Sequence, residues 1–128
     1  MGNGTTIGAV RGHGAAHHGS HHWLMQRFTA VGNLLLSLWL VVSFLLLPNF
    51  SYASVHEWIT RPVPALAVAF LLVSVFWHVR LGLQIAIEDY VHTSANRFAS
   101  MAVLNLLTIG GAGFGLFSII RLALGAAA

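Results

Sequence analysis

Cysteine and lysine are absent from this chain of 128 residues, and only three of its residues are acidic. Without cysteine the chain forms no disulfide, and it cannot on its own hold a thiolate-bound zinc ion or an iron–sulfur cluster. Its six arginines are scattered along the sequence and leave a formal net charge of only +3. So few positive charges do not form a groove that follows the phosphates of a nucleic acid, and we expect no nucleic-acid partner.

Charged residues make up 7% of the chain and hydrophobic residues 57%, a composition outside the range of ordinary soluble domains. Three apolar stretches, at about 27–47, 64–90 and 97–124, are each long enough to cross about 30 Å of hydrocarbon as a helix. The segment 49–64 is expected to be a loop at the level of the lipid headgroups. The sequence therefore predicts an all-α membrane protein, with a three-helix transmembrane anchor over residues 26–128.

Residues 1–25 hold six glycines and five of the eight histidines. They lack the apolar core of a signal peptide and the Arg- and Ser-rich pattern of a mitochondrial transit segment. We therefore expect a flexible, exposed N-terminal segment, and a bacterial inner membrane rather than a mitochondrial one. His17 with His21, and His18 with His22, have the i, i+4 spacing of a helical metal site, although so much glycine favours a solvated tail.

An odd number of spans places the N-terminal segment and the turn after the second span on the same side of the membrane. That side carries Arg11, Arg27 and Arg97, whereas the other side carries Arg61 and Arg121. Because positively charged segments tend to remain in the cytoplasm, the N-terminus is expected to be cytoplasmic.

The third span contains the run "GGAGFG" at residues 110–115. A glycine-rich run can cradle phosphate, but this one lies inside an apolar segment and includes the GxxxG pair Gly111 and Gly115. This spacing favours close packing between helices.

The second span has two polar faces. At about 100° per residue, His78, Gly82 and Asp89 return to nearly the same side of the helix. A stripe at i, i+4 and i+8 spacing lies roughly opposite and consists of Arg80, Gln84 and Glu88.

A histidine inside a bilayer is costly unless it is paired or used. A glycine one turn after His78 leaves room for a flat group, such as a haem whose iron takes the imidazole. Alternatively, His78 donates a hydrogen bond to a neighbouring helix while Gly82 allows close packing. The spacing leaves both interpretations open.

Arg27 begins the first span on the side of the membrane where the second span ends. Its planar guanidinium suits a haem propionate, but it could equally anchor the helix to lipid phosphates. Asp89 and Tyr90 lie about 18 Å along the helix axis from His78, near the membrane surface. A tyrosine beside a carboxylate can donate a hydrogen bond or proton to a quinone, or serve as an interfacial anchor.

The stretch "HVRLGLQIAIEDYVH" resembles the H-x-x-x-G-x-x-x-x-x-x-D-Y-V signature of a known family, the small hydrophobic membrane anchors of succinate dehydrogenase. The stretch "HHWLMQRFTAV" resembles the R-x-T-A opening of that family's first span, so the resemblance covers Trp23 to about Val91. The resemblance implies that His78 is an axial ligand of a haem b, the iron being shared with the companion anchor, and that Arg27 approaches a propionate. It also implies that Tyr90, polarised by Asp89, binds a quinone, with ubiquinone expected. Arg80 is not part of the signature.

The same resemblance implies a membrane anchor of succinate:quinone oxidoreductase, serving the respiratory chain and the tricarboxylic acid cycle. The implied partners are a flavoprotein subunit, an iron–sulfur subunit and a companion membrane anchor. This chain itself is expected to contain no dicarboxylate active site. Two alternatives stay open: a stand-alone b-type cytochrome, and a structural or assembly protein of the membrane without a redox role.

Overall fold

The computed structural model describes residues 17–125, and the side chains from residue 20 onward. This part of the chain contains four helices and no strand: α2 (His17–Leu45), α3 (Tyr52–Thr60), α4 (Pro62–Tyr90) and α5 (Ser94–Ala123). Three of the four, α2, α4 and α5, are long and apolar enough to cross a membrane. The prediction of an all-α protein with three transmembrane helices is thereby confirmed.

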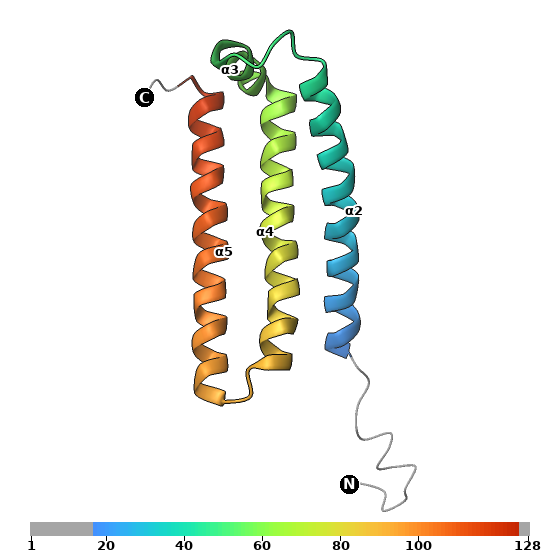
Figure 1. The fold of residues 1–128 in the computed structure, drawn as a ribbon, viewed down its shortest axis with the longest axis vertical. Helices are drawn as coiled ribbons and strands as arrows, with labels where there is room; N and C mark the ends of the chain where they lie inside the picture. Colours follow the sequence, from blue (N-terminus) through green and yellow to red (C-terminus); the bar gives the residue numbers. More distant parts are fainter. Residues whose placement is uncertain (1–16, 126–128) are drawn as a thin grey trace, which may run out of the picture.

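The three long helices stand side by side in a single layer, with α4 in the middle (Figure 1). Helix α4 packs against both of its neighbours, whereas the backbones of α2 and α5 do not come close to each other in the described part of the chain. The start of α2 and the turn between α4 and α5 lie at the same end of the layer, called here the turn end. Helix α3 crosses the opposite end, called here the α3 end.

Helix α2 begins well before the first apolar stretch, so the prediction of a flexible segment over 1–25 is wrong for residues 17–25. Only one of the glycines, Gly19, falls within those residues. The early turns of α2 are also held by side-chain contacts, with Arg27 4.3 Å above the Trp23 ring and Gln26 against α4. Contacts of this kind stabilise a helix beyond its hydrophobic part. Residues 1–16 lie outside the described residues.

The segment 49–64, expected to be a loop, contains the short helix α3. The hydroxyl of Ser51 caps it by accepting a hydrogen bond from the Ser54 N–H at 3.4 Å. Arg61 then takes an extended conformation, as expected of a residue before proline, and Pro62 starts α4 at a position where its missing N–H costs nothing.

An aromatic cluster fastens α3 to the end of α2. The Trp58 Nε1–H donates to the Ser43 hydroxyl at 2.7 Å, and the Trp58 ring stacks on Trp39 with centroids 6.1 Å apart. Phe44 meets the same indole edge-on at 5.0 Å. Trp58 and Ile59 are buried, and this burial explains why a polar-looking segment is helical.

Two glycines of α5 receive side chains of α4. A Cβ at Gly111 would lie 2.6 Å from the Phe76 ring, and one at Gly115 would lie 2.5 Å from a methyl group of Leu72. Both glycines therefore make room for side chains of α4, and the prediction that "GGAGFG" serves helix packing is confirmed.

We expect Gly111→Val to destabilise the protein, because two methyl groups would enter the space that the Phe76 ring fills. The expected cost is about 1–3 kcal/mol, seen as a lower unfolding temperature of the purified complex in detergent. Gly110→Val is the matched control, since a Cβ there meets nothing within 4 Å. Equal unfolding temperatures for the two variants would contradict this account of the α4–α5 contact.

Candidate functional site

His78 lies between α2 and α4, toward the turn end. Its Nδ1 is 3.0 Å from the hydroxyl oxygen of Thr29, a side chain only 8% exposed. The Thr29 hydroxyl donates its one hydrogen to the helix backbone, at 2.9 Å from the Met25 carbonyl oxygen. When the hydroxyl hydrogen is placed in this way, the Thr29 oxygen accepts from the His78 Nδ1–H, and in that tautomer the lone pair of the neutral imidazole is on Nε2.

The other ring nitrogen of His78 faces a glutamine of α2. The Nε2 atoms of Gln26 and His78 are 3.5 Å apart, a weak contact, and a Cβ at Gly82 would lie 3.6 Å from the same amide nitrogen. Gln26 therefore occupies the space that Gly82 leaves open. Its Oε1 is buried and has no hydrogen-bond partner among the described residues. The amide is thus poorly satisfied where it lies.

A groove of about 560 Å³ opens between α2 and α4 at the turn end, and Gln26 forms part of its wall. Arg27 lines this groove and is exposed, with its guanidinium over Trp23. The Nε2 of His22, also on the wall, is buried without a partner among the described residues. The groove therefore offers a positive charge and an unpaired ring nitrogen next to the glutamine that touches His78.

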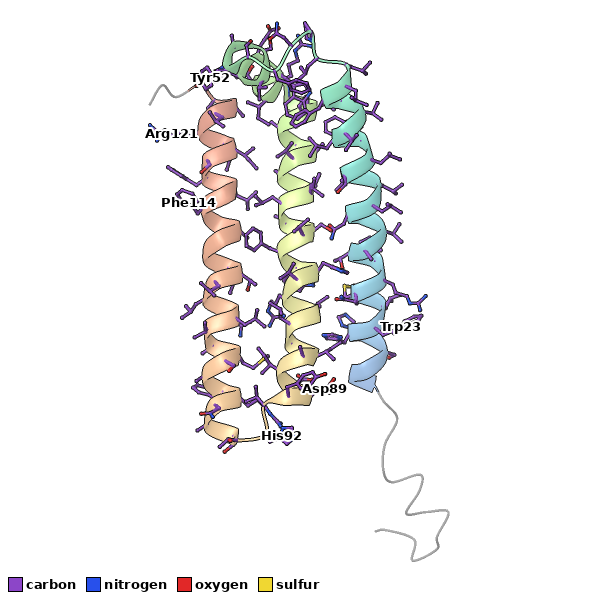
Figure 2. All side chains as sticks on the ribbon, viewed as in Figure 1. Trp23, Tyr52, Asp89, His92, Phe114 and Arg121 are labelled. Atoms are coloured by element: carbon purple, nitrogen blue, oxygen red, sulfur yellow. The ribbon has the colours of Figure 1, made fainter. Side chains whose placement is uncertain are left out.

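Asp89 and Tyr90 are the last two residues of α4. Figure 2 shows Asp89 at the turn end, with Trp23 of α2 farther along the layer. The Tyr90 side chain is 84% exposed, and Asp89 is exposed as well. Within residues 20–125 neither side chain makes a hydrogen bond. The Asp89 carboxylate and the Tyr90 hydroxyl are thus exposed at the end of the helix that carries His78.

The predicted stripe of Arg80, Gln84 and Glu88 does not act as one unit. Arg80 turns to α5, where its Nε donates to the Asn105 side-chain oxygen at 2.7 Å. Gln84 instead donates to Glu88 at 2.9 Å, and both of these side chains line the groove between α2 and α4. The two ends of the stripe therefore face different neighbours.

The described part of the chain contains no cluster of three or more side chains able to hold a metal ion. Any iron at His78 would thus need ligands from elsewhere. The side chains of His17 and His18 lie outside the described ones, and their predicted pairing with His21 and His22 remains a prediction.

Three residues of this region were not predicted: Thr29, Gln26 and Asn105. Thr29 and Gln26 stand in or beside the R-x-T-A motif, but their partner His78 is 49 and 52 positions away, a separation that no local pattern reveals. Asn105 could have been noticed as an amide inside an apolar span.

Comparison with known proteins identifies the family. Residues 1–112 match the model of the succinate dehydrogenase/fumarate reductase transmembrane subunit. The succinate dehydrogenase hydrophobic membrane anchor subunit of Rickettsia bellii (strain RML369-C) is 35% identical over 75% of this chain and 77% of its own length. The corresponding subunit of Rickettsia conorii (strain ATCC VR-613 / Malish 7) is 32% identical over the same shares. The succinate dehydrogenase membrane anchor subunit of Reclinomonas americana is 31% identical over 71% of this chain and 78% of its own length. The chain therefore belongs to the family of succinate dehydrogenase/fumarate reductase transmembrane subunits.

Proposed function

We propose that this chain is the small hydrophobic membrane anchor of a succinate:quinone oxidoreductase, and that it binds haem b and forms part of the quinone site. The family makes it a multi-pass membrane protein that works within a larger oxidoreductase complex. The partners we propose are a flavoprotein, an iron–sulfur subunit and a companion membrane anchor. The proposed location is a bacterial inner membrane, with the N-terminus in the cytoplasm.

The observation that carries the proposal is the hydrogen bond between His78 and Thr29. The contact restrains the imidazole ring, and in the tautomer that donates from Nδ1 to Thr29 the Nε2 lone pair is the one a metal would take. Gln26 stands against that nitrogen, but only at 3.5 Å, through the end of a flexible side chain whose oxygen is unpaired. Turning this side chain aside exposes both Nε2 and Gly82. The residues present therefore fit a haem at His78.

Bound haem would supply a one-electron redox centre within the membrane. This chain would hold the haem through two side chains: the His78 imidazole would bind the iron, and Thr29 would keep the imidazole ring from turning. Arg27, on the wall of the groove at the turn end, is the group we assign to a propionate, through charge-assisted hydrogen bonds. A second histidine bound to the iron would have to come from the companion anchor, because His78 is the single histidine between residues 57 and 91.

We assign Tyr90 to the quinone. Its hydroxyl is free to donate a hydrogen bond to a carbonyl oxygen of the ring, at the membrane surface where a quinone headgroup and water-borne protons meet. Reduction of a quinone to a quinol takes up two electrons and two protons. Asp89 is the adjacent carboxylate that would polarise the hydroxyl once partner subunits enclose both groups. The dicarboxylate reaction is assigned to the flavoprotein, and none of it to this chain.

The test of this function is to purify the complex through a tag on this chain, identify the co-purifying subunits by mass, and record a reduced-minus-oxidised spectrum. We expect a b-type haem together with a flavoprotein and an iron–sulfur subunit. A colourless complex with these partners would refute the haem assignment alone, and recovery of the chain without partners would refute the function.

One observation favours a competing role for His78 as a purely structural residue: both of its ring nitrogens already contact side chains of α2. In that case the complex contains no haem that depends on His78.

Thr29 provides a finer test. We expect Thr29→Val to keep the shape of the side chain but remove the hydroxyl that lies 3.0 Å from His78 Nδ1, weakening haem binding by about 10- to 100-fold. Thr29→Ser retains the hydroxyl and should bind haem nearly as the unmodified chain does. The measurement is the transfer of haem to an excess of a haem-free acceptor protein, followed in the Soret band. Equal transfer rates for the valine and serine variants would refute the positioning role of Thr29.

A further inference from the structure

Arg80 is a charged side chain far inside α4. It lies ten residues before the end of the helix, about 15 Å by helical rise. If the 29 residues of α4, about 43 Å, are centred in about 30 Å of hydrocarbon, then Arg80 lies roughly 9 Å below the membrane surface. A guanidinium at that depth is costly unless it is paired or put to use.

The pairing of Arg80 within the described chain is incomplete. Its Nε donates to Asn105, and its guanidinium carbon lies 5.6 Å from the centre of the Trp77 ring, but neither partner carries a charge. The one ion pair found among residues 20–125 joins Arg61 to Glu57 at the α3 end. The four terminal N–H groups of Arg80 have no acceptor in the described part of the chain. The guanidinium of Arg80 therefore has no anionic partner in the described part of the chain.

A groove of about 630 Å³ leads away from Arg80 between α4 and α5. From Asn105 to Leu116 it follows α5 for eleven residues, about 16 Å, or three helical turns. Beyond its polar end it is lined mainly by apolar side chains, and on α5 two of its residues are small, Ala112 and Gly113. Small residues let another helix backbone come close. The groove therefore combines a cationic end with an apolar track of helical length.

Two kinds of occupant could supply an anion in a membrane, a lipid headgroup and an acidic side chain. A lipid phosphate belongs outside the hydrocarbon, and reaching Arg80 would require it to sink by about 9 Å. A side chain carried on a transmembrane helix can lie at that depth while the rest of the helix fills the apolar track. The charge, the depth and the small residues all favour the helix.

We propose that a transmembrane helix of another subunit packs into the groove between α4 and α5 and places a carboxylate against Arg80. This inference rests on the proposed function only in requiring a multisubunit complex. It does not depend on haem at His78 or quinone at Tyr90.

Because this chain has no cysteine, an introduced cysteine is its single labelling site, and only adducts that contain this chain are counted. Gly113→Cys places a thiol in the groove without a clash, because a Cβ there meets nothing within 4 Å. Phe114→Cys is the matched control, since Phe114 does not line the groove and projects on the side of α5 away from α4 (Figure 2). Each variant complex is labelled in the membrane with a maleimide benzophenone and irradiated, and the adducts are identified by mass spectrometry.

We expect the label at position 113 to join a partner protein at least about tenfold more often than the label at 114. Adducts with lipid alone at 113, or equal partner adducts at both positions, would overturn the inference. Recovery of the unmodified chain without any partner would refute the proposed function, and this inference with it.

A second experiment tests whether the positive charge of Arg80 is needed to hold the partner helix. Arg80→Gln should lower the recovery of the partner with this chain by at least about tenfold after a detergent wash, because it leaves a carboxylate buried and unpaired. Arg80→Lys should restore part of the recovery. Arg121→Gln removes the same charge outside the groove, at the exposed end of α5, and should recover the partner as the unmodified chain does. Equal recovery with Arg80→Gln and Arg121→Gln would overturn the role of Arg80.

Discussion

Replacing His78 by alanine is expected to abolish the b-type haem spectrum of the complex, or to convert it to that of a haem with one ligand lost. The reason is that the imidazole restrained by Thr29 is the single histidine between residues 57 and 91, and imidazole is a common ligand of haem iron. The measurement is the reduced-minus-oxidised spectrum of the purified complex, normalised to its flavin content so that loss of haem is separated from loss of protein.

The control for this prediction is His92→Ala. His92 lies in the exposed turn after α4, where its ring is 3.2 Å from the backbone oxygen of Tyr90. We expect its removal to leave the haem spectrum unchanged. If His78→Ala has the same spectrum as the unmodified complex, the axial ligand lies elsewhere and His78 is a packing residue. If both variants lose haem equally, the effect of His78 is not specific.

Replacing Tyr90 by phenylalanine is expected to lower quinone reduction by about 100-fold while the haem spectrum stays as it is. The substitution removes one hydroxyl from a side chain that is 84% exposed, so the fold should not change. Electron transfer from succinate to a water-soluble dye accepted at the flavoprotein should also be retained. The informative quantity is therefore the ratio of quinone reduction to dye reduction in the same preparation.

Tyr52→Phe is the matched control for the tyrosine. Tyr52 is 80% exposed and belongs to α3, at the other end of the layer from Tyr90. It should keep the unmodified ratio of quinone to dye reduction. An unchanged ratio in Tyr90→Phe would remove this residue from the quinone site, and an equal fall in both variants would indicate a general effect on the membrane domain.

Sequence alone predicted the three spans well because hydropathy and length are local properties. The second predicted span, about 64–90, differs from Pro62–Tyr90 by two residues at one end. The short helix α3 was missed because its stability comes from Trp58, which packs on Trp39 of another helix. The early start of α2 is not evident from the overall glycine content of residues 1–25, because most of those glycines precede His17.

In the candidate site, too, features set within one helix could be predicted and contacts between helices could not. His78, Asp89 and Tyr90 could be selected from one continuous motif, because a helix fixes their relative positions along its axis. The residues that contact His78 could not be predicted in this way. Thr29 and Gln26 belong to α2, and their contacts with His78 depend on how α2 packs against α4. The helical spacing predicts one stripe of Arg80, Gln84 and Glu88, yet Arg80 donates to Asn105 of α5 while Gln84 donates to Glu88.

The single-layer arrangement has a consequence for the life of the newly inserted chain. Because α4 has a neighbour on each side but none on its two faces, the protein has almost no interior, and just four large apolar side chains are buried within residues 20–125: Trp58, Ile59, Leu81 and Leu104. Lipid tolerates the exposed apolar faces, since they lose little by facing acyl chains. What lipid does not tolerate is a charged side chain such as Arg80. In a copy that stands alone in lipid, the unfavourable free energy therefore comes from a few polar side chains and not from the exposed apolar faces.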